Sequence, residues 1–372
     1  MIVSRVTNSM LKNTLLSNLG MNLSRMDKLQ NQLSTGRKYG SISDDPSALI
    51  YGQAARNKLA RLSHYQSAVE TAQTWLTQAE AGVMEVNKVI GAVYEELVSA
   101  GSVKTPEDKQ NLAKVVSQLR DHYVDTLNTA FGDRFVFSGY NTPGDFAAGE
   151  APVLKPFTIV EEMNATTGRM EPQLYFNGFN ISQFDGWTTD DFNSDPPIST
   201  ELEELRALMN DVVTFDVGPG IEMPVTLNGI DLVFFVTKDP DTGTPIVRNT
   251  FDLLSEVYND INGFPYDPAA TPPGPIPPAV TDDLTKQIKL VQDAQNHVLT
   301  RTAEIGGRQR RLELLEARYE QDNINYESMR SDAEDADMAE VIMYLKMAET
   351  VYQAALSAGA RIIQPTLMDF LR

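Results

Sequence analysis

The feature that most constrains this chain is the contrast between its two ends and its middle. Residues 1–130 and 282–372 have the pattern of long amphipathic helices with few prolines, whereas residues 141–280 hold 17 of the 20 prolines. The same middle segment carries 22 acidic and 5 basic residues, so it supplies −17 of the chain's net charge of −20. A charge imbalance confined to one segment indicates a separate, solvent-facing domain inserted between two helical arms. The two arms must then meet each other in space.

The N-terminal arm contains three predicted helices. The first spans about residues 8–33, because its apolar residues recur three and four positions apart on one stripe. The second runs from Pro46 to about Ser99 and begins at an Asp-Asp-Pro cap signal. The third ends near Phe131. The alternating residues 134–139 then predict a strand or a hairpin at the exit from the arm.

The middle segment has the pattern of strands and loops. Two Asn-Gly pairs, at 177–178 and 228–229, each lie between apolar runs. Asn-Gly supplies the positive φ angles of a tight hairpin turn, so each pair predicts a hairpin. Residues 200–213 and 250–261 have the pattern of short helices packed on the sheet. The proline-rich residues 265–278 exclude a helix and predict an extended return linker.

The C-terminal arm is helical again from Thr281 and ends in a heptad pattern over residues 338–362 that is rich in Ala and Gly. Each extreme end of the chain thus presents an apolar stripe, which favours pairing of the ends and a seam for assembly with other subunits. An ordinary helical-bundle core is the alternative. The predicted assembly seam comprises Leu19, Leu23, Met26, Leu33, Met338, Val341, Ile342, Leu345, Tyr352, Leu356 and Ile362.

These patterns predict a mainly α fold. It consists of a long antiparallel helical bundle and a terminal coiled coil, both built from the two chain ends, with an inserted β-rich (α+β) outer domain. The predicted domains are a terminal coiled coil (1–42 with 332–372), a helical bundle (43–140 with 281–331) and the acidic outer domain (141–280).

Composition excludes several classes of function. The chain has no cysteine, so disulfides and thiolate sites are impossible, and the negative net charge argues against nucleic acid as a partner. No run of 18 apolar residues predicts a membrane span, and the first residues lack the apolar core of a cleavable signal. The three histidines, His64, His122 and His297, lie far apart in the sequence, and a His-Glu-x-x-His zinc motif is absent. We therefore expect that the protein is not an enzyme and that it binds no metal and no cofactor.

Several motifs at the two ends resemble those of the bacterial flagellin superfamily. In the N-terminal arm these are residues 33–38 (Leu-Ser-Thr-Gly-Arg-Lys) and 43–48 (Ser-Asp-Asp-Pro-Ser-Ala), and in the C-terminal arm residues 334–340 and 365–371. Pro46 after the Asp pair and the Phe-Val-Phe-Ser-Gly-Tyr run at 135–140 favour the branch of the superfamily that joins the flagellar hook to the filament. The resemblance covers both arms and excludes residues 141–280.

The resemblance implies a structural subunit that is exported through the flagellar type III channel and placed outside the cell at the hook–filament junction. The implied partners are further copies of the chain in a ring or helical assembly, a neighbouring hook-associated protein, flagellin, and an export chaperone at the C-terminal helix. Flagellin itself is one alternative. A non-flagellar surface module, whose helical arms only present the acidic β domain, is another.

Overall fold

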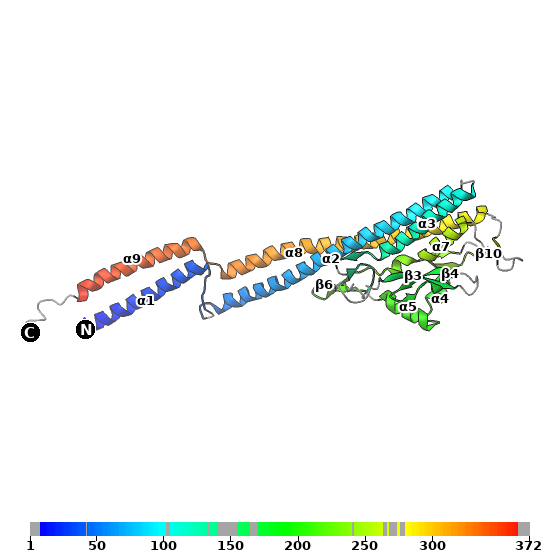
Figure 1. The fold of residues 1–372 in the computed structure, drawn as a ribbon. Helices are drawn as coiled ribbons and strands as arrows, with labels where there is room; N and C mark the ends of the chain where they lie inside the picture. Colours follow the sequence, from blue (N-terminus) through cyan, green and yellow to red (C-terminus); the bar gives the residue numbers. More distant parts are fainter. Residues whose placement is uncertain are drawn as a thin grey trace, which may run out of the picture. The chain divides into compact units, whose positions relative to one another are not determined.

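The structure, a computed structural model, separates into two compact units. Unit 1 comprises Met1–His64 with Arg318–Arg372, and unit 2 comprises Tyr65–Ala317. Two long helices, α2 (Pro46–Ala100) and α8 (Val280–Glu334), contribute to both units (Figure 1). The residues that the structure describes are 8–41, 43–101, 105–132, 134–139, 155–163, 170–210, 212–239, 242–262, 266–267, 274–275 and 280–363.

Unit 1 is built around a pair of terminal helices. Helix α1 (Asn8–Thr35) lies antiparallel beside α9 (Met338–Ile363), as Figure 1 shows in blue and red. The pair is close at its outer end, because a Cβ built on Gly359 would lie 2.8 Å from Cδ2 of Leu15. The predicted pairing of the two chain ends is therefore present in the structure.

Unit 2 has a helical part and a β-rich part. The helical part consists of α3 (Pro106–Leu127) with the adjoining portions of α2 and α8. Thr105 caps α3, since its hydroxyl accepts a hydrogen bond from the Asp108 amide at 3.2 Å, and Pro106 occupies the first turn. Regularly spaced side chains of these helices are buried, among them Val69, Leu76, Val83, Ile90, Leu97, Val116, Tyr123, Leu127, Val291, Val298 and Ile305.

A short hairpin follows α3. The helix ends at Leu127, four residues before the expected position, because the chain turns there into β1 (Ala130–Phe131), which pairs with β2 (Arg134–Phe135). The next residues, Val136 and Phe137, are completely buried. The predicted hairpin is confirmed, and it directs an aromatic side chain into the core of unit 2.

The β-rich part contains small antiparallel sheets and short helices rather than one large sheet. Its three-stranded sheet has the order β3-β4-β5, and the other strands form two-stranded pairs. The strands are β3 (Phe157–Met163), β4 (Met170–Phe176), β5 (Phe179–Asn180), β6 (Thr214–Gly218), β7 (Ile221–Pro224), β8 (Phe234–Lys238), β9 (Pro245–Asn249), β10 (Tyr266–Asp267) and β11 (Gly274–Pro275). The helices are η1 (Ser182–Phe184), α4 (Thr189–Phe192), α5 (Thr200–Asn210), α6 (Ile230–Val233) and α7 (Thr250–Asn262).

The Asn-Gly pairs at 177–178 and 228–229 have different structures. Asn177 and Gly178 form the tight turn between β4 and β5, with φ of 50° and 86°, so this predicted hairpin is confirmed. The hairpin predicted at Asn228-Gly229 is wrong. Gly229 has a helical φ of −62° and precedes α6, and its amide donates to the Phe137 carbonyl at 2.9 Å. Glycine is required there for close approach, because a Cβ would lie 2.6 Å from the Phe157 ring.

The fold class predicted from the sequence is confirmed: paired helical ends enclose a β-rich segment in the chain. The helices expected near residues 200–213 and 250–261 are present as α5 and α7. Helix α7 packs on α3, where the Arg120 guanidinium lies 5.4 Å from the centre of the Phe251 ring. Of the expected linker over 265–278, the structure describes only β10 and β11, which pair antiparallel, and the remainder lies outside the described residues.

Candidate assembly site

The α1–α9 pair is held by a small apolar cluster. Leu29 of α1 and Val341, Leu345 and Ala348 of α9 are 6–8% exposed. Half-buried hydrophobic residues pack around this cluster, namely Met26, Leu33, Ala336 and Tyr344. The structure thus brings together four residues of the predicted seam, Met26, Leu33, Val341 and Leu345.

The other seam residues are less covered. Leu19 and Tyr352 are half-buried. Leu23, Met338, Ile342 and Leu356 remain 41–48% exposed, and the side chain of Ile362 lies outside the described residues. The buried contacts of the pair are therefore concentrated at the end of α1 and the start of α9. Whether the seam mediates assembly between subunits stays a prediction.

A second apolar stripe lies on α9 away from α1. Met343, Met347 and Val351 recur every four residues and are 55%, 51% and 46% exposed. At about 100° per residue, the centre of this outer stripe lies ~140° around the helix from Val341 and Leu345. The heptad pattern of residues 338–362 does not predict this stripe, because that pattern defines only one face of the helix. The four-residue spacing of the two methionines was the signal that indicates a second face.

A clasp joins the two connectors of unit 1. We define it as residues 36–39, between α1 and α2, together with residues 332–336, which are the end of α8 and the first residues after it. Arg37 and Asp335 form an antiparallel bridge. The backbone amide of Lys38 donates to the Glu334 carbonyl at 2.7 Å, and the Ala336 amide donates to the Gly36 carbonyl at 2.8 Å. The clasp therefore fixes the points from which α1 and α9 depart.

A buried carboxylate anchors the clasp. The Glu334 side chain is 8% exposed and accepts hydrogen bonds from Nε of Arg56, at 3.1 Å, and from Nη2 of the same guanidinium. The Tyr39 hydroxyl donates to the Ala333 carbonyl beside it. Gly52 of α2 leaves room for Glu334, since a Cβ there would lie 2.8 Å from Cγ of the glutamate. The Arg56 side chain is 41% exposed, but the Glu334 carboxylate is buried and would be left poorly paired if the guanidinium moved away.

Gly52→Ala should loosen the clasp, although glycine-to-alanine changes inside helices ordinarily stabilise. The added methyl group displaces Glu334 from Arg56 and leaves a buried carboxylate poorly paired, at a cost of about 1–3 kcal/mol. Amide exchange at residues 37–39 and 333–336 measures the effect. Gly20→Ala in α1 is the matched control, because nothing lies within 4 Å of its Cβ. It should stabilise α1 by ~0.5–1 kcal/mol. Equal protection of the clasp in both variants would contradict this prediction.

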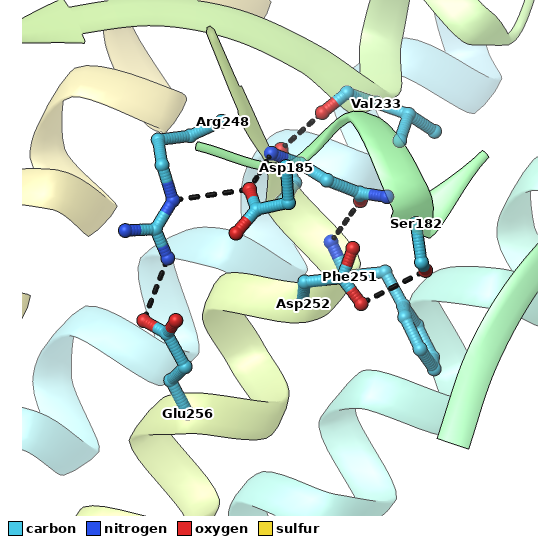
Figure 2. A network of polar contacts seen from close by, with 9 residues as sticks. Ser182, Asp185, Val233, Arg248, Phe251, Asp252 and Glu256 are labelled. Atoms are coloured by element: carbon cyan, nitrogen blue, oxygen red, sulfur yellow. Dashed lines mark hydrogen bonds and ion pairs between the residues drawn. The ribbon is translucent and has the colours of Figure 1, made fainter. Parts of the chain in front are cut away.

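The β-rich part of unit 2 holds a network of polar contacts (Figure 2). Arg248 of β9 donates from Nε to Asp185 at 3.0 Å and from Nη2 to Glu256 of α7 at 2.6 Å. Asp252, one turn before Glu256, accepts a hydrogen bond from the Ser182 hydroxyl at 2.9 Å. The network ties η1, β9 and α7 together.

The network contains more acid than base. Three carboxylates, Asp185, Asp252 and Glu256, surround the single guanidinium of Arg248. Burial raises the pKa of Asp185 to about 6 despite its contact with Arg248. Burial, together with the negative charge of Asp185, raises the pKa of Asp252 well above its usual value. The folded protein therefore binds protons here more tightly than the unfolded chain does.

The Asp252→Asn substitution should become progressively more stabilising, relative to the wild type, as the pH rises. A carboxyl with a raised folded pKa contributes stability below its unfolded pKa, near 4, and loses that contribution as the pH rises through the folded value. Asparagine retains the acceptor for Ser182 and does not ionise. Between pH 4 and 8, the free energy of unfolding of the variant minus that of the wild type should increase by up to ~1.4 kcal/mol per pH unit. Denaturant titrations across this range measure the difference. A constant difference, equal to that of the exposed control Asp190→Asn, would contradict the assignment.

Neither a candidate metal site nor a candidate membrane span is found among the described residues. Among them, no group of three or more His, Asp or Glu side chains is placed to hold a metal ion. Nor does any helix within the described ranges combine the length and apolar character of a membrane span. His297 contacts the Asp231 carbonyl at 2.7 Å, and His122 lies 3.6 Å from Glu85, so each has a local structural neighbour.

Comparison with known families matches both helical arms. Residues 6–142 match the bacterial flagellin N-terminal helical region, and residues 288–371 match the bacterial flagellin C-terminal helical region. Together the matched ranges cover more than half of the 372 residues. The chain belongs to the bacterial flagellin family. The relatives of this family to which the chain is similar are structural proteins of the flagellum.

Two curated relatives resemble this flagellin-family chain over limited stretches. Flagellar hook-associated protein 3 of Salmonella typhimurium is 28% identical over 150 residues, which are 39% of the chain and 47% of the relative. The flagellar filament 30.7 kDa core protein of Treponema maltophilum is 27% identical over 150 residues, which are 40% of the chain and 50% of the relative. The chain thus spans about half the length of these relatives.

A solved structure shares the fold. A protein of Vibrio parahaemolyticus named as a flagellar hook-associated protein superposes with a TM-score of 0.52, at 17% sequence identity. The match covers 78% of the flagellin-family chain and 100% of the solved one. At this identity the likeness concerns the fold alone.

Proposed function

We propose that this chain is the subunit that joins the flagellar hook to the filament and that it assembles with its own copies through the α1–α9 pair. The observation that carries the proposal is the outer stripe of Met343, Met347 and Val351, which remains about half exposed on a helix whose other apolar face already packs on α1. Exposed apolar stripes of this kind mark sites of protein association.

The outer stripe complements the exposed residues of α1. Leu16 and Leu23, seven residues apart on one side of α1, are 62% and 48% exposed. An α1–α9 pair that displays apolar side chains on both helices can pack against a second pair, with side chains interdigitating between neighbouring helices. A ring or helical homo-oligomer follows from repeating one such contact around an axis.

The closest alternative is a filament subunit of the same family. The similarity to a filament core protein covers as much of the chain as the similarity to a hook-associated protein does. The junction role is favoured by the run Phe135–Gly139, which places the buried Phe137 at the exit from α3. A surface module that only presents the β-rich segment would need no exposed stripe at the chain ends.

The junction role carries further proposals about partners. The neighbours in the flagellum would be another hook-associated protein on one side and flagellin on the other, and the location would be outside the cell after type III export. Helix α9 would be the segment that an export chaperone covers, since its outer stripe has to be shielded from water and from other copies before assembly. No nucleic acid or membrane partner is proposed.

Met347→Asp tests the assembly. The substitution places a charge in the centre of the outer stripe, and burying that charge between subunits would cost several kcal/mol. The monomer should keep its α1–α9 pair, because Met347 points away from α1. A flagellated strain that carries the variant should retain hooks, lack filaments and release flagellin into the medium, as seen by electron microscopy and by immunoblotting of the supernatant.

Gln353→Asp is the matched control, because it introduces the same charge on the exposed polar side of α9. Cells with this variant should carry normal filaments. Normal filaments in the Met347→Asp strain would overturn the assembly surface. Filaments that form but are composed of the variant itself would favour the filament-subunit alternative.

A further inference from the structure

The chain contains three Asn-Gly pairs, and the two whose residues the structure describes in full lie in opposite environments. Asn177-Gly178 lies at the exposed turn between β4 and β5, whereas Asn228-Gly229 lies in the interior ahead of α6. Asn228 is 0% exposed. A difference in reactivity between the two pairs must therefore come from the fold and not from the local sequence.

The backbone at Asn177 is in the left-handed region, and the residue is exposed. Among the described residues it is the one non-glycine residue with a positive φ, of 50°. Such a conformation is unfavourable for most side chains and tolerated by asparagine. Strand β5 has only two residues, so few contacts hold this turn. A Cβ built on Gly178 would meet nothing within 4 Å, which shows how open the turn is.

We propose that Asn177-Gly178 is a site of spontaneous succinimide formation, which converts Asn177 to aspartate or isoaspartate. The backbone nitrogen of Gly178 loses its proton and bonds to Cγ of Asn177. The bond from Cγ to Nδ2 breaks, and ammonia leaves. Water then opens one of the two ring carbonyls, which gives aspartate with the normal backbone or isoaspartate with the backbone rerouted through the side chain. The step requires no oxidant and no cofactor.

Asn228-Gly229 is protected by its hydrogen bonds. The Asn228 side chain donates from Nδ2 to the Leu208 carbonyl and accepts at Oδ1 from the Ile230 amide at 3.1 Å. The Gly229 nitrogen, which would be the nucleophile, donates to the Phe137 carbonyl at 2.9 Å. The same ring closure at this pair would require the loss of all three contacts.

The reaction would alter the turn and its charge. Either product adds a negative charge to a segment that already carries 22 acidic residues. Isoaspartate also adds one backbone atom to a turn whose register rests on the pairs Tyr175–Asn180 and Phe176–Phe179. We therefore expect β5 to detach from β4 in the isoaspartate form. In a long-lived assembly, modified copies would then differ from new copies in the charge and the conformation of this turn.

The test is an incubation of the full-length folded protein in mildly alkaline buffer, followed by peptide mass spectrometry with fragmentation. Asn177 should convert at least about 30-fold faster than Asn228, which corresponds to about 2 kcal/mol for the two side-chain hydrogen bonds of Asn228 alone. In urea both sites should convert at similar rates, because the protection of Asn228 is then lost. Purified Asn177→Asp protein supplies the chromatographic standard for the aspartate product.

Two results would overturn the proposal. One is equal conversion of the two sites in the folded protein. The other is conversion of Asn177 in urea only, which would show that the folded turn blocks ring closure. Faster conversion of Asn177 in the folded protein, with comparable rates in urea, supports it.

Discussion

Replacing Leu345 with aspartate should separate α1 from α9 while leaving unit 2 folded. Leu345 is 8% exposed and belongs to a cluster with only three other buried side chains. An uncompensated buried charge costs about 3–5 kcal/mol, which a cluster of this size cannot offset. Amide exchange should show loss of protection across residues 8–35 and 338–363, and the thermal transition of unit 2 should be unchanged.

Gln353→Asp again provides the control, since it adds the same charge to the same helix at an exposed position. It should leave the protection of both terminal helices as in the wild type. Because separated helices cannot present a joint surface, Leu345→Asp should also abolish filament growth. Retained protection of α1 in this variant would show that the pair does not depend on the cluster around Leu29.

Phe137→Ala should strongly destabilise unit 2. The Phe137 ring is 0% exposed, fills the space beside Gly82 of α2, and follows the hairpin that leaves α3. Truncation of a buried phenylalanine to alanine costs about 3–5 kcal/mol. For a unit of this size, the melting temperature should fall by about 6–20 °C. Calorimetry of the full-length protein measures the shift.

Phe131→Ala is the matched control, because Phe131 lies in the same hairpin with 41% of its surface exposed. Its removal should lower the melting temperature by a small fraction of that shift. If the two variants melted alike, the core position of Phe137 would be wrong. The comparison thus separates the contribution of the buried Phe137 side chain from that of an exposed phenylalanine in the same hairpin.

The long helices were predictable because their signals are local. The cap before Pro46 and the proline-led start of α3 are determined by a few neighbouring residues, and α2 and α3 begin there. Asn177-Gly178 formed the expected turn for the same reason. At Asn228-Gly229, by contrast, contacts from distant residues, the Phe137 carbonyl and the Phe157 ring, overrode the local preference. Sequence alone cannot reveal such contacts.

The candidate assembly site likewise has features that local sequence signals predict and features that depend on distant contacts. Heptad spacing identified the residues that pack α9 on α1, including Val341 and Leu345. The clasp was missed because Glu334 is an ordinary helical acid in the sequence, and only the fold buries it against Arg56 and Gly52. The domain boundaries expected at residues 140 and 281 stay a prediction. Unit 2 itself contains contacts across them, such as the hydrogen bond from Tyr123 to Leu232 at 3.4 Å.

The clasp has a consequence for the order of folding. The hydrogen bond from Tyr39 to Ala333 spans 294 residues of chain, so closing it requires nearly the entire polypeptide. Contacts between distant residues form slowly because the intervening chain must first be brought together, and synthesis delivers the N-terminal residues long before the C-terminal ones. During synthesis, helix α1 therefore stays unpaired until α9 has been made. A chain that terminates before residue 333 therefore lacks both this hydrogen bond and the α1–α9 pair.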